Sequence, residues 1–394
     1  MNEPQVDRGG SRTSRARPSR RGVLWAAGAG AAVAGLGGTL AAVARSTPRD
    51  GGSAAEGRAR RGMVVPADET PHVRTWMSWP TSRTIWGGDL PGVQRDIALI
   101  ARTVAAYEPV IMCAPDERSA ARARARCGRT VTVLDSIPTD DLWMRDTCAV
   151  FRTDGEGGVD TVGLGFNGWG GKQRHGRDAR VARGVAARTG RDFTRAGFVG
   201  EGGAVETDGD GTLMATESSL VNANRNPGRT RDEIEADVLR AYGARKMIWV
   251  PGIEGEDITD DHIDVTSRFV RPGVVMVQVP PRGRTDIWAK DAREQLAILS
   301  RTRDARGRRL RIIEVEGPGE IRTANPGLVD SYLNFHVVNG GVITARFGDR
   351  RTDEGARRAL AAAFPGREVV QLDVTRLMGG GGGIHCATMQ EPRA

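Results

Sequence analysis

Two short segments of the sequence concentrate carboxylates, and one of them also holds a histidine that could act as a general base. Residues 140–147 set four charges around Trp143. Such charges are costly to bury unless they are paired or take part in function. In residues 257–264, His262 lies among four Asp residues, and if this segment enters a strand, His262 and Asp264 point to the same face. A His beside carboxylates on one face is how a general base is held and tuned.

Both segments also have ordinary interpretations. Residues 140–147 could form an exposed turn in which Arg145 pairs with a neighbouring acid. Residues 257–264 could be a solvated acidic turn or a calcium-type cluster of oxygens, although their spacing does not match a known calcium loop. The two segments therefore need a nucleophile before they indicate catalysis.

A third segment, residues 379–388, supplies a candidate nucleophile. Cys386 comes shortly after five consecutive glycines, which let the backbone approach a ligand closely and adopt positive φ. A Gly run alone is more often a flexible loop, a lone Cys is usually a small buried hydrophobe, and the phosphate-loop pattern is absent. The combination of a Cys, a distant His and carboxylates nevertheless favours thiol catalysis.

The elements that must position these residues alternate along the chain, which predicts an α/β domain. The strand-like runs are 110–113, 131–134, 248–250, 274–279, 310–315, 342–345 and 369–372, and the helix candidates are 94–106, 231–242, 291–300 and 354–363. No composition break and no exact repeat divides residues 63–394, so we expect one domain, larger than the usual single core.

The N-terminal region has the layout of an export signal. An Arg-rich stretch ends in Arg20-Arg21, a Gly/Ala-rich apolar stretch follows, and residues 42–44 offer a small-residue cleavage site. We therefore interpret residues 1–44 as a twin-arginine-type signal peptide and residues 45–62 as a disordered linker, so that the protein is exported already folded. An uncleaved membrane anchor is the alternative, because the apolar stretch is long enough to span a bilayer.

The net charge of +8 does not indicate a nucleic-acid partner. Residues 1–62 hold eleven Arg and four acidic residues, whereas the remainder holds 46 basic and 45 acidic residues. A nucleic-acid binder keeps its basic patch on the folded domain. The four cysteines form no CxxC pair and no His lies at metal-ligand spacing, so no zinc site is indicated. Cys113 and Cys127 could still form a disulfide outside the cytoplasm.

Six motifs follow one another in order over nearly the whole body. They are residues 76–80 (WMSWP), 141–146 (DLWMRD), 166–172 (FNGWGGK), 201–203 (EGG), 260–264 (DDHID) and 383–386 (GIHC). Each is weak alone, but in this order they resemble the agmatine deiminase and bacterial peptidylarginine deiminase family. The resemblance implies the pentein fold, a five-bladed pseudo-symmetric α/β propeller of ββαβ-type units around a central pocket. It also implies hydrolytic removal of the imine nitrogen from a guanidinium group.

The resemblance further implies roles for single residues. Cys386 corresponds to the nucleophile and His262 to the general acid and base. Asp146 and Asp264 correspond to the carboxylates that hold the guanidinium, whose fork of N–H donors calls for acceptors with bidentate reach. The reaction would pass through a covalent thiouronium intermediate, with no metal and no organic cofactor.

Four further residues are expected in or near the substrate pocket. Glu201 and Trp169 are implied as pocket residues, and a cation over the Trp face would be favourable. Arg145 and Trp143 complete the set of substrate-binding candidates. The expected partner is a small guanidinium molecule or an arginine-containing peptide, with membrane contact only through the leader and its export machinery.

The substrate stays open at this point. Where the family usually continues Gly-Pro, this chain has Cys148-Ala149, which puts the local turn in doubt but not Asp146. Agmatine, converted to N-carbamoylputrescine and ammonia, is the expected substrate, but such enzymes typically act in the cytoplasm, so free or peptidyl arginine is the alternative for an exported chain. An amidinotransferase of the same fold and a non-catalytic binder of arginine or polyamines are further alternatives, and the oligomeric state is open.

Overall fold

The computed structural model describes residues 62–319, 321 and 327–393. The predicted signal peptide, and the predicted linker up to residue 61, lie outside these residues. Within the described part of the chain, no helix has both the length and the apolar character needed to cross a membrane.

The described strands form five small sheets. The first holds, in order, β16 (Thr388–Pro392), β1 (His72–Ser78), β2 (Val110–Cys113) and β3 (Val131–Leu134). The second holds β4 (Val150–Thr153), β5 (Val159–Gly163) and β6 (Phe193–Arg195), and the third holds β7 (Val205–Thr207), β8 (Thr212–Thr216) and β9 (Lys246–Val250). The fourth holds β10 (Ser267–Arg271), β11 (Val274–Val279) and β12 (Arg311–Glu316), and the fifth holds β13 (His336–Val338), β14 (Gly341–Ala345) and β15 (Glu368–Leu372).

One connection pattern recurs in the five sheets. An edge strand pairs antiparallel with the next strand, which continues through a helix into a parallel third strand. In the first sheet the antiparallel strand is β16, so the last described strand completes the sheet that β1 begins. Strands β5, β8 and β14 are buried along their whole length, but only β14 contains one of the predicted apolar runs, because Asp160, Thr161, Thr212 and Thr216 interrupt or flank the apolar residues of β5 and β8.

The longer helices connect the parallel strands. They are α2 (Leu90–Val104), α3 (Glu117–Cys127), α6 (Val181–Thr189), α8 (Arg231–Tyr242), α10 (Ile287–Leu299) and α11 (Arg350–Ala363). The shorter helices are α1 (Arg83–Trp86), α4 (Met144–Thr147), α5 (Gly168–Gly171), α7 (Glu217–Leu220), α9 (Ile263–Thr266), α12 (Thr375–Met378), η1 (Gly87–Asp89), η2 (Asp178–Arg180) and η3 (Gly202–Ala204).

Predicted and observed elements agree best where the end signals are local. The predicted helix 231–242 is confirmed as α8, because Thr230 and Glu233 form a reciprocal capping box and Gly243 ends the helix in the left-handed conformation. Helices α10 and α11 each begin four residues earlier than predicted, because the side chains of Asp286 and Asp349 cap them. The predicted strands 110–113, 131–134 and 274–279 are confirmed with the same bounds.

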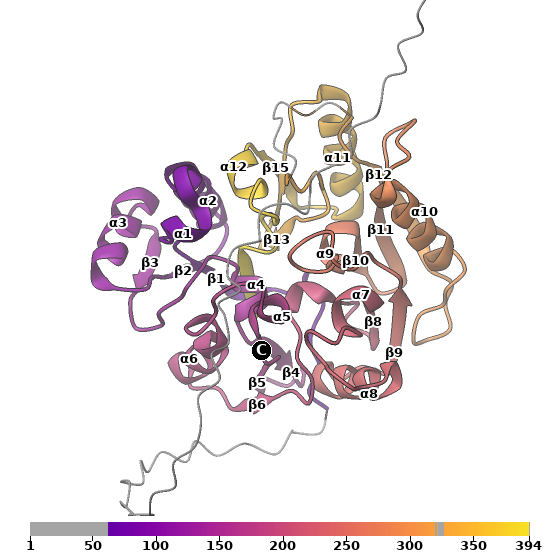
Figure 1. Ribbon diagram of the computed structural model, residues 1–394, viewed down its shortest axis with the longest axis horizontal. Coiled ribbons are helices and arrows are strands. Elements are labelled where there is room, and N and C mark those ends of the chain that lie inside the picture. The colour runs from indigo at the N-terminus through magenta and orange to yellow at the C-terminus, as the bar shows by residue number, and fades with distance from the viewer. Residues whose placement is uncertain (1–61, 320, 322–326, 394) are drawn as a thin grey trace, which may run out of the picture.

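The middle of the molecule is occupied by short helices that carry the motif residues. Figure 1 shows α4, α5 and α9 in the middle of the view, with the five sheets placed around them. The condition that residues 257–264 enter a strand is not met, because His262 is the N-cap of α9 and Asp264 lies within that single helical turn. Strand β10 begins only at Ser267. The helical turn, not strand alternation, therefore sets the directions of these two side chains.

Candidate active site

Cys386 lies in the turn that leads into β16, held by Asn334. Its Sγ lies 3.1 Å from Asn334 Nδ2 and 3.5 Å from Asp264 Oδ2. The backbone N–H of Cys386 donates to Asn334 Oδ1 at 3.2 Å. One amide side chain therefore contacts both the backbone and the sulfur of the candidate nucleophile.

Close packing of two tryptophans explains much of the glycine run. A Cβ at Gly380 would lie 2.2 Å from the ring of Trp86, and a Cβ at Gly382 would lie 2.5 Å from the ring of Trp143. The two rings also pack on each other, with centroids 5.9 Å apart. In the described structure the backbone of the run thus approaches protein side chains, and the reading of this run as a flexible loop is not supported.

His262 is buried between two acidic residues. Its Nε2 lies 3.3 Å from Glu201 Oε2, and its Nδ1 lies 3.8 Å from Asp146 Oδ1. Among the described residues Nδ1 has no hydrogen-bond partner. A buried imidazole nitrogen without a partner is unfavourable in the resting protein. It is therefore a candidate contact for a molecule that enters the site.

A buried arginine fixes the loop that leads to His262. Arg225 Nε donates to both oxygens of Glu201 at 2.9 and 3.0 Å, and its Nη1 donates to Asp260 Oδ2 at 2.7 Å. Asp260 and Asp261 both have positive φ, 59° and 67°, which is unfavourable for residues other than Gly. Such strain persists only where surrounding contacts enforce it, and here Arg225 is one of those contacts.

The Asp146 carboxylate is oriented from two sides. Its Oδ1 accepts the backbone N–H of Gly203 at 3.0 Å, and its Oδ2 accepts Trp169 Nε1–H at 2.9 Å. Trp169 is itself held in a left-handed conformation, with φ of 55°, and its ring packs edge-on against Phe166. The predicted pocket residue Trp169 therefore contacts the carboxylate directly.

The second carboxylate, Asp264, has one occupied oxygen and one open oxygen. Oδ2 accepts Asn334 Nδ2–H at 3.2 Å and lies 2.7 Å from His385 Nδ1. Oδ1 is buried and has no hydrogen-bond partner among the described residues. A buried carboxylate oxygen in this state calls for a donor, and an N–H of a cation would be the strongest one.

Gly203 marks the point on which these groups converge. A Cβ at Gly203 would lie 2.8 Å from His262 Nδ1, 2.9 Å from Asp146 Oδ1 and 3.1 Å from Asp264 Oδ2. No real side chain tolerates three such approaches, so only glycine fits there. This explains the Glu-Gly-Gly motif, in which Glu201 contacts His262 and the second glycine makes room for three polar groups.

The charges of the site shift its protonation equilibria. Burial disfavours an imidazolium, but Asp146 and Glu201 outweigh it and raise the pKa of His262 to about 9. Burial raises the pKa of Asp146 to about 6, with the charges of Glu201 and Asp264 adding to the rise. Burial and the carboxylates of Asp264 and Asp146 raise the pKa of the Cys386 thiol well above its ordinary value. The empty site at neutral pH therefore holds a thiol, an imidazolium and carboxylates.

The segment 140–147 is not the exposed turn that was one interpretation of its charges. Asp141, Arg145 and Asp146 are all buried. Asp141 accepts Trp86 Nε1–H at 2.8 Å and Gln173 Nε2–H at 3.0 Å. These bonds fix the start of α4, which carries Asp146.

The guanidinium of Arg145 contacts residues of the C-terminal segment. Its guanidinium donates to Gln390 Oε1 at 2.7 Å and approaches the carbonyl of His385 at 3.5 Å. The structure therefore places this predicted substrate-binding residue among side chains behind the nucleophile. No described contact brings it to Asp146 Oδ1 or to His262.

A cleft of about 880 Å³ shares Trp143 and the glycine run with this cluster. The four predicted catalytic residues do not line it themselves. Its described acidic lining residues are Asp89, Glu256, Asp257, Asp261, Asp291 and Asp330.

The two basic residues of the described lining are already paired. Arg284 contacts Asp286 and Asp330 at 2.8 and 2.7 Å, and Arg376 contacts Asp89 at 2.9 Å. The described walls of the cleft are therefore negative in balance, which favours a cationic ligand.

Sequence reasoning missed several residues that complete the site. Asn334, which holds the thiol, stands in a segment with no motif signal of its own. Arg225 lies in a polar turn, 24 residues after the Glu201 that it pairs with. His385 stands inside the quoted motif beside Cys386, but only the fold reveals that its ring faces Asp264. In each case a contact between distant segments identifies the residue, and no local sequence pattern indicates that contact.

Four cysteines are described, and all are free and buried. The considered bridge between Cys113 and Cys127 is therefore absent from the structure. Cys113 ends β2, whereas Cys127 ends α3. Cys148, which stands where the family usually has Gly, is the C-cap of α4 and packs in the apolar core without displacing Asp146.

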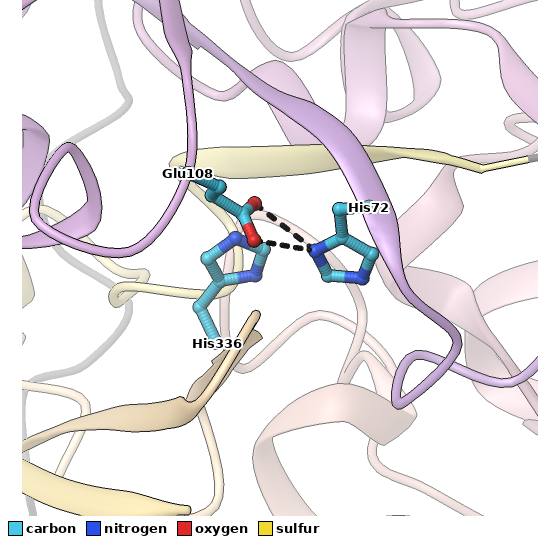
Figure 2. Close-up of side chains that lie close together, drawn as sticks. All are labelled: His72, Glu108 and His336. Atoms are coloured by element: carbon cyan, nitrogen blue, oxygen red, sulfur yellow. Dashed lines mark hydrogen bonds and ion pairs between the residues drawn. The ribbon is translucent and has the colours of Figure 1, made fainter.

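One described cluster has the donor types of a metal site. His72, Glu108 and His336 are buried, with donor atoms within 4.8 Å of one another. Figure 2 shows His72 Nδ1 facing both oxygens of Glu108, at 3.0 and 3.1 Å. His72 Nε2 faces the carbonyl of Asp68 at 3.0 Å, so both nitrogens of His72 face acceptors. The hydroxyl of Thr75 donates to Glu108 and lies 2.9 Å from His336 Nε2, so the cluster forms a hydrogen-bonded link between β1 and β13.

The comparisons with known proteins agree with this arrangement. The model of the Porphyromonas-type peptidyl-arginine deiminase family matches residues 64–392. The chain is 36% identical over 355 residues to an agmatine deiminase of Stutzerimonas stutzeri, an alignment that covers 84% of this chain and 96% of the relative. It is 35% identical over 364 residues to an agmatine deiminase of Pseudomonas aeruginosa, with the same shares covered.

Solved structures give the same picture. The structure of the agmatine deiminase of Enterococcus faecalis superposes with a TM-score of 0.79 at 27% identity, over 84% of this chain and 96% of that one. The mixed α/β fold with five small sheets is therefore shared with an agmatine deiminase. From the family match and the identity to its relatives together, the chain belongs to the agmatine deiminase and Porphyromonas-type peptidyl-arginine deiminase family, as the six ordered motifs predict.

Proposed function

We propose that this protein is a cysteine hydrolase that converts agmatine to N-carbamoylputrescine and ammonia. The observation that carries the proposal is the convergence of His262 Nδ1, Asp146 Oδ1 and Asp264 Oδ2 around Gly203, next to a thiol 3.5 Å from Asp264. A guanidinium is a planar cation with a fork of N–H donors, which suits two carboxylates that flank one small volume. The relatives named agmatine deiminase support the same assignment.

In the first half of the reaction, Asp146 and Asp264 hold the guanidinium. The Cys386 thiolate adds to its central carbon and gives a neutral tetrahedral adduct. The His262 imidazolium then gives its proton to the departing nitrogen, and ammonia leaves. An S-alkylthiouronium cation stays bonded to Cys386, still paired with the two carboxylates.

In the second half, neutral His262 removes a proton from water. The hydroxyl adds to the thiouronium carbon, the C–S bond breaks and the ureido product leaves. The hydroxyl proton of the adduct passes to solvent as the ureido carbonyl forms, and the thiolate and the imidazolium are restored, so each cycle consumes one water and releases one ammonia and one proton. The raised pKa of His262, about 9, suits a group that must be protonated before the first step.

Substrate binding itself can activate the thiol. The carboxylates of Asp264 and Asp146 contribute to the raised pKa of Cys386. A guanidinium bound between them adds a positive charge beside Sγ, which opposes this effect and lowers the thiol pKa. The thiolate then forms mainly when a substrate is present.

The charge of the cleft favours agmatine over free arginine. Agmatine carries a second cation at its far end, whereas free arginine carries a carboxylate there. The described lining offers six acidic residues, and its two arginines, Arg284 and Arg376, already pair with carboxylates. A substrate carboxylate would meet negative walls with no open basic partner in that lining.

The test is release of the ureido product from the purified protein with agmatine, free arginine and an internal-arginine peptide in parallel. We expect the highest kcat/KM with agmatine, and loss of all activity in Cys386→Ser. A preference for arginine or for the peptide would contradict the substrate assignment. Transfer of the amidino group to an added amine would indicate an amidinotransferase, and tight agmatine binding without turnover would indicate a binding protein.

Two further parts of the proposal concern architecture and location. The repeated connection in the five sheets supports interpreting them as the blades of a pseudo-symmetric pentein propeller that forms a single catalytic domain. The Arg-rich leader supports export by the twin-arginine pathway. Fractionation of cells that express the chain with Arg20 and Arg21 both changed to Lys tests the second part, because retention of the variant inside the cell is expected and unchanged export would contradict it.

A further inference from the structure

A second histidine lies behind the candidate catalytic residues and has no part in the reaction described above. His385 immediately precedes Cys386 and is 2% exposed. Its Nδ1 lies 2.7 Å from Asp264 Oδ2, and its Nε2 lies 3.1 Å from Asp68 Oδ2. The ring therefore bridges one carboxylate of the substrate site and one carboxylate outside it.

The outer carboxylate is firmly held. Asp68 Oδ2 accepts Arg268 Nη2–H at 2.7 Å, and Asp68 Oδ1 accepts Gln390 Nε2–H at 2.5 Å. Arg268 is fully buried and also pairs with Glu206 at 2.5 Å. Asp68 is therefore a fixed point, and the backbone of His385 is fixed as well, since its N–H donates to the carbonyl of Asn334 at 3.1 Å.

The ring carries one proton at neutral pH, and geometry indicates where. Burial lowers the pKa of His385, and the positive charges of Arg145 and Arg268 lower it further against the pull of the two carboxylates. The Asp264 contact is the shorter of the two, which places the N–H on Nδ1. The Nε2 lone pair then faces an oxygen whose charge Arg268 already offsets.

The contact with His385 orients the carboxylate of Asp264, which has one oxygen without a hydrogen-bond partner in the described part of the chain. Its Oδ2 is held by Asn334 and by the shorter contact to His385, which leaves Oδ1 without a partner. Without the His385 contact, the carboxylate could turn, and Oδ1 could then be satisfied by protein groups instead of by a ligand. A fixed orientation of an acceptor lowers the cost of binding a planar cation.

We propose that His385 is a positioning residue: its Nδ1–H holds Asp264 Oδ2 beside Cys386 Sγ, so that the carboxylate keeps the orientation in which it pairs with the guanidinium. This inference rests on the proposed function, because it assigns Asp264 to guanidinium binding. The inference requires that residue 385, next to Cys386, has a hydrogen-bond donor at the position of Nδ1. The outer contact, through Nε2, has a supporting role only.

Two amide substitutions separate the two nitrogens. In His385→Asn the amide nitrogen can take the place of Nδ1, so the donor to Asp264 is kept and the reach to Asp68 is lost. In His385→Gln the amide reaches the place of Nε2, so the contact to Asp68 is kept and the donor to Asp264 is lost. Both variants remove the ring, so a general packing defect affects them alike.

The experiment measures kcat and KM for agmatine, together with the melting temperature, for the wild type and both variants. We expect KM to rise about 10- to 100-fold in His385→Gln, as for a lost hydrogen bond to a charged group, and at least ten-fold less in His385→Asn. The melting temperatures of the two variants should be similar. Equal KM values in the two variants, or a larger rise in His385→Asn, would overturn the proposal.

A binding measurement separates failure of this inference from failure of the proposed function. Titration calorimetry of agmatine on a Cys386→Ala background, which cannot turn the substrate over, should give a dissociation constant that changes between the two His385 variants as KM does. If the wild type does not turn agmatine over, the proposed function fails. If it turns over and the dissociation constants of the two variants are equal, only the role of His385 fails.

Discussion

A methyl group at Gly203 tests whether the convergence of three polar groups matters for activity. In Gly203→Ala the new Cβ would lie 2.8 Å from His262 Nδ1, 2.9 Å from Asp146 Oδ1 and 3.1 Å from Asp264 Oδ2. Ordinary contacts begin near 3.4 Å, so these atoms must each move by roughly 0.3 to 0.6 Å. The φ angle of Gly203 is not positive, so an alanine can adopt the backbone conformation.

The expected loss follows from that displacement. A misplacement of about 1 Å in a site costs on the order of 100-fold in rate, so half that distance at three groups predicts a fall in kcat/KM of about 10- to 100-fold. Overpacking of this kind lowers the free energy of unfolding by about 1–3 kcal/mol, which leaves the protein folded at moderate temperature.

The assay compares Gly203→Ala with a matched glycine substitution. Gly176 is exposed, its φ is not positive, and a Cβ there would meet no atom within 4 Å, so Gly176→Ala should keep wild-type kcat/KM. Ureido-product release and chemical denaturation are measured on both variants. Wild-type activity in a folded Gly203→Ala protein would refute the reasoning, because it would mean that the three groups need not hold their observed positions.

Two further predictions concern charge. A plot of kcat/KM against pH should be bell-shaped, with a fall below about pH 6 as Asp146 gains a proton and a fall above about pH 9 as His262 loses one; a flat activity profile would contradict this. Because the pKa of His262 is raised in the folded state, its contribution to stability is complete below its unfolded pKa of about 6.5 and is lost as the pH rises through about 9. Denaturation at several pH values measures this loss, and a free energy of unfolding that does not change over that range would contradict it. Arg225→Met should lower the free energy of unfolding by about 3–5 kcal/mol, because it leaves Glu201 as a buried charge without its partner, whereas Arg357→Met at an exposed pair should leave it nearly unchanged; equal denaturation midpoints for the two variants would count against the buried clamp.

The sequence predicts those features of the fold that local signals determine. A capping box and a terminal glycine determine the bounds of helix α8, and strand β11 begins with the apolar run 274–277, whose residues are all buried. The short helices α4, α5 and α9 have no such signals. Tertiary contacts fix the turns that carry the motif residues, so the strand considered for residues 257–264 does not form and His262 caps a helical turn instead.

The same limit applies to the site. The motifs name Cys386, His262 and the two carboxylates because the resemblance carries them over, but contacts across long separations cannot be read from one sequence. Asn334 meets Cys386 across 52 positions, and Asp68 meets His385 across 317. The position of Arg145 illustrates the same limit, because its motif does not indicate that the guanidinium contacts Gln390 and approaches the carbonyl of His385.

The central claim is that Cys386 forms a covalent bond to the guanidinium carbon of the substrate. The most direct test is mass spectrometry of the peptide that contains Cys386, after the protein has been mixed with agmatine and quenched in acid. We predict that the wild type, quenched during turnover, carries an adduct on Cys386 with the mass of agmatine less ammonia. Ureido product formed by the wild type with no adduct on Cys386 at any quench time would contradict the account.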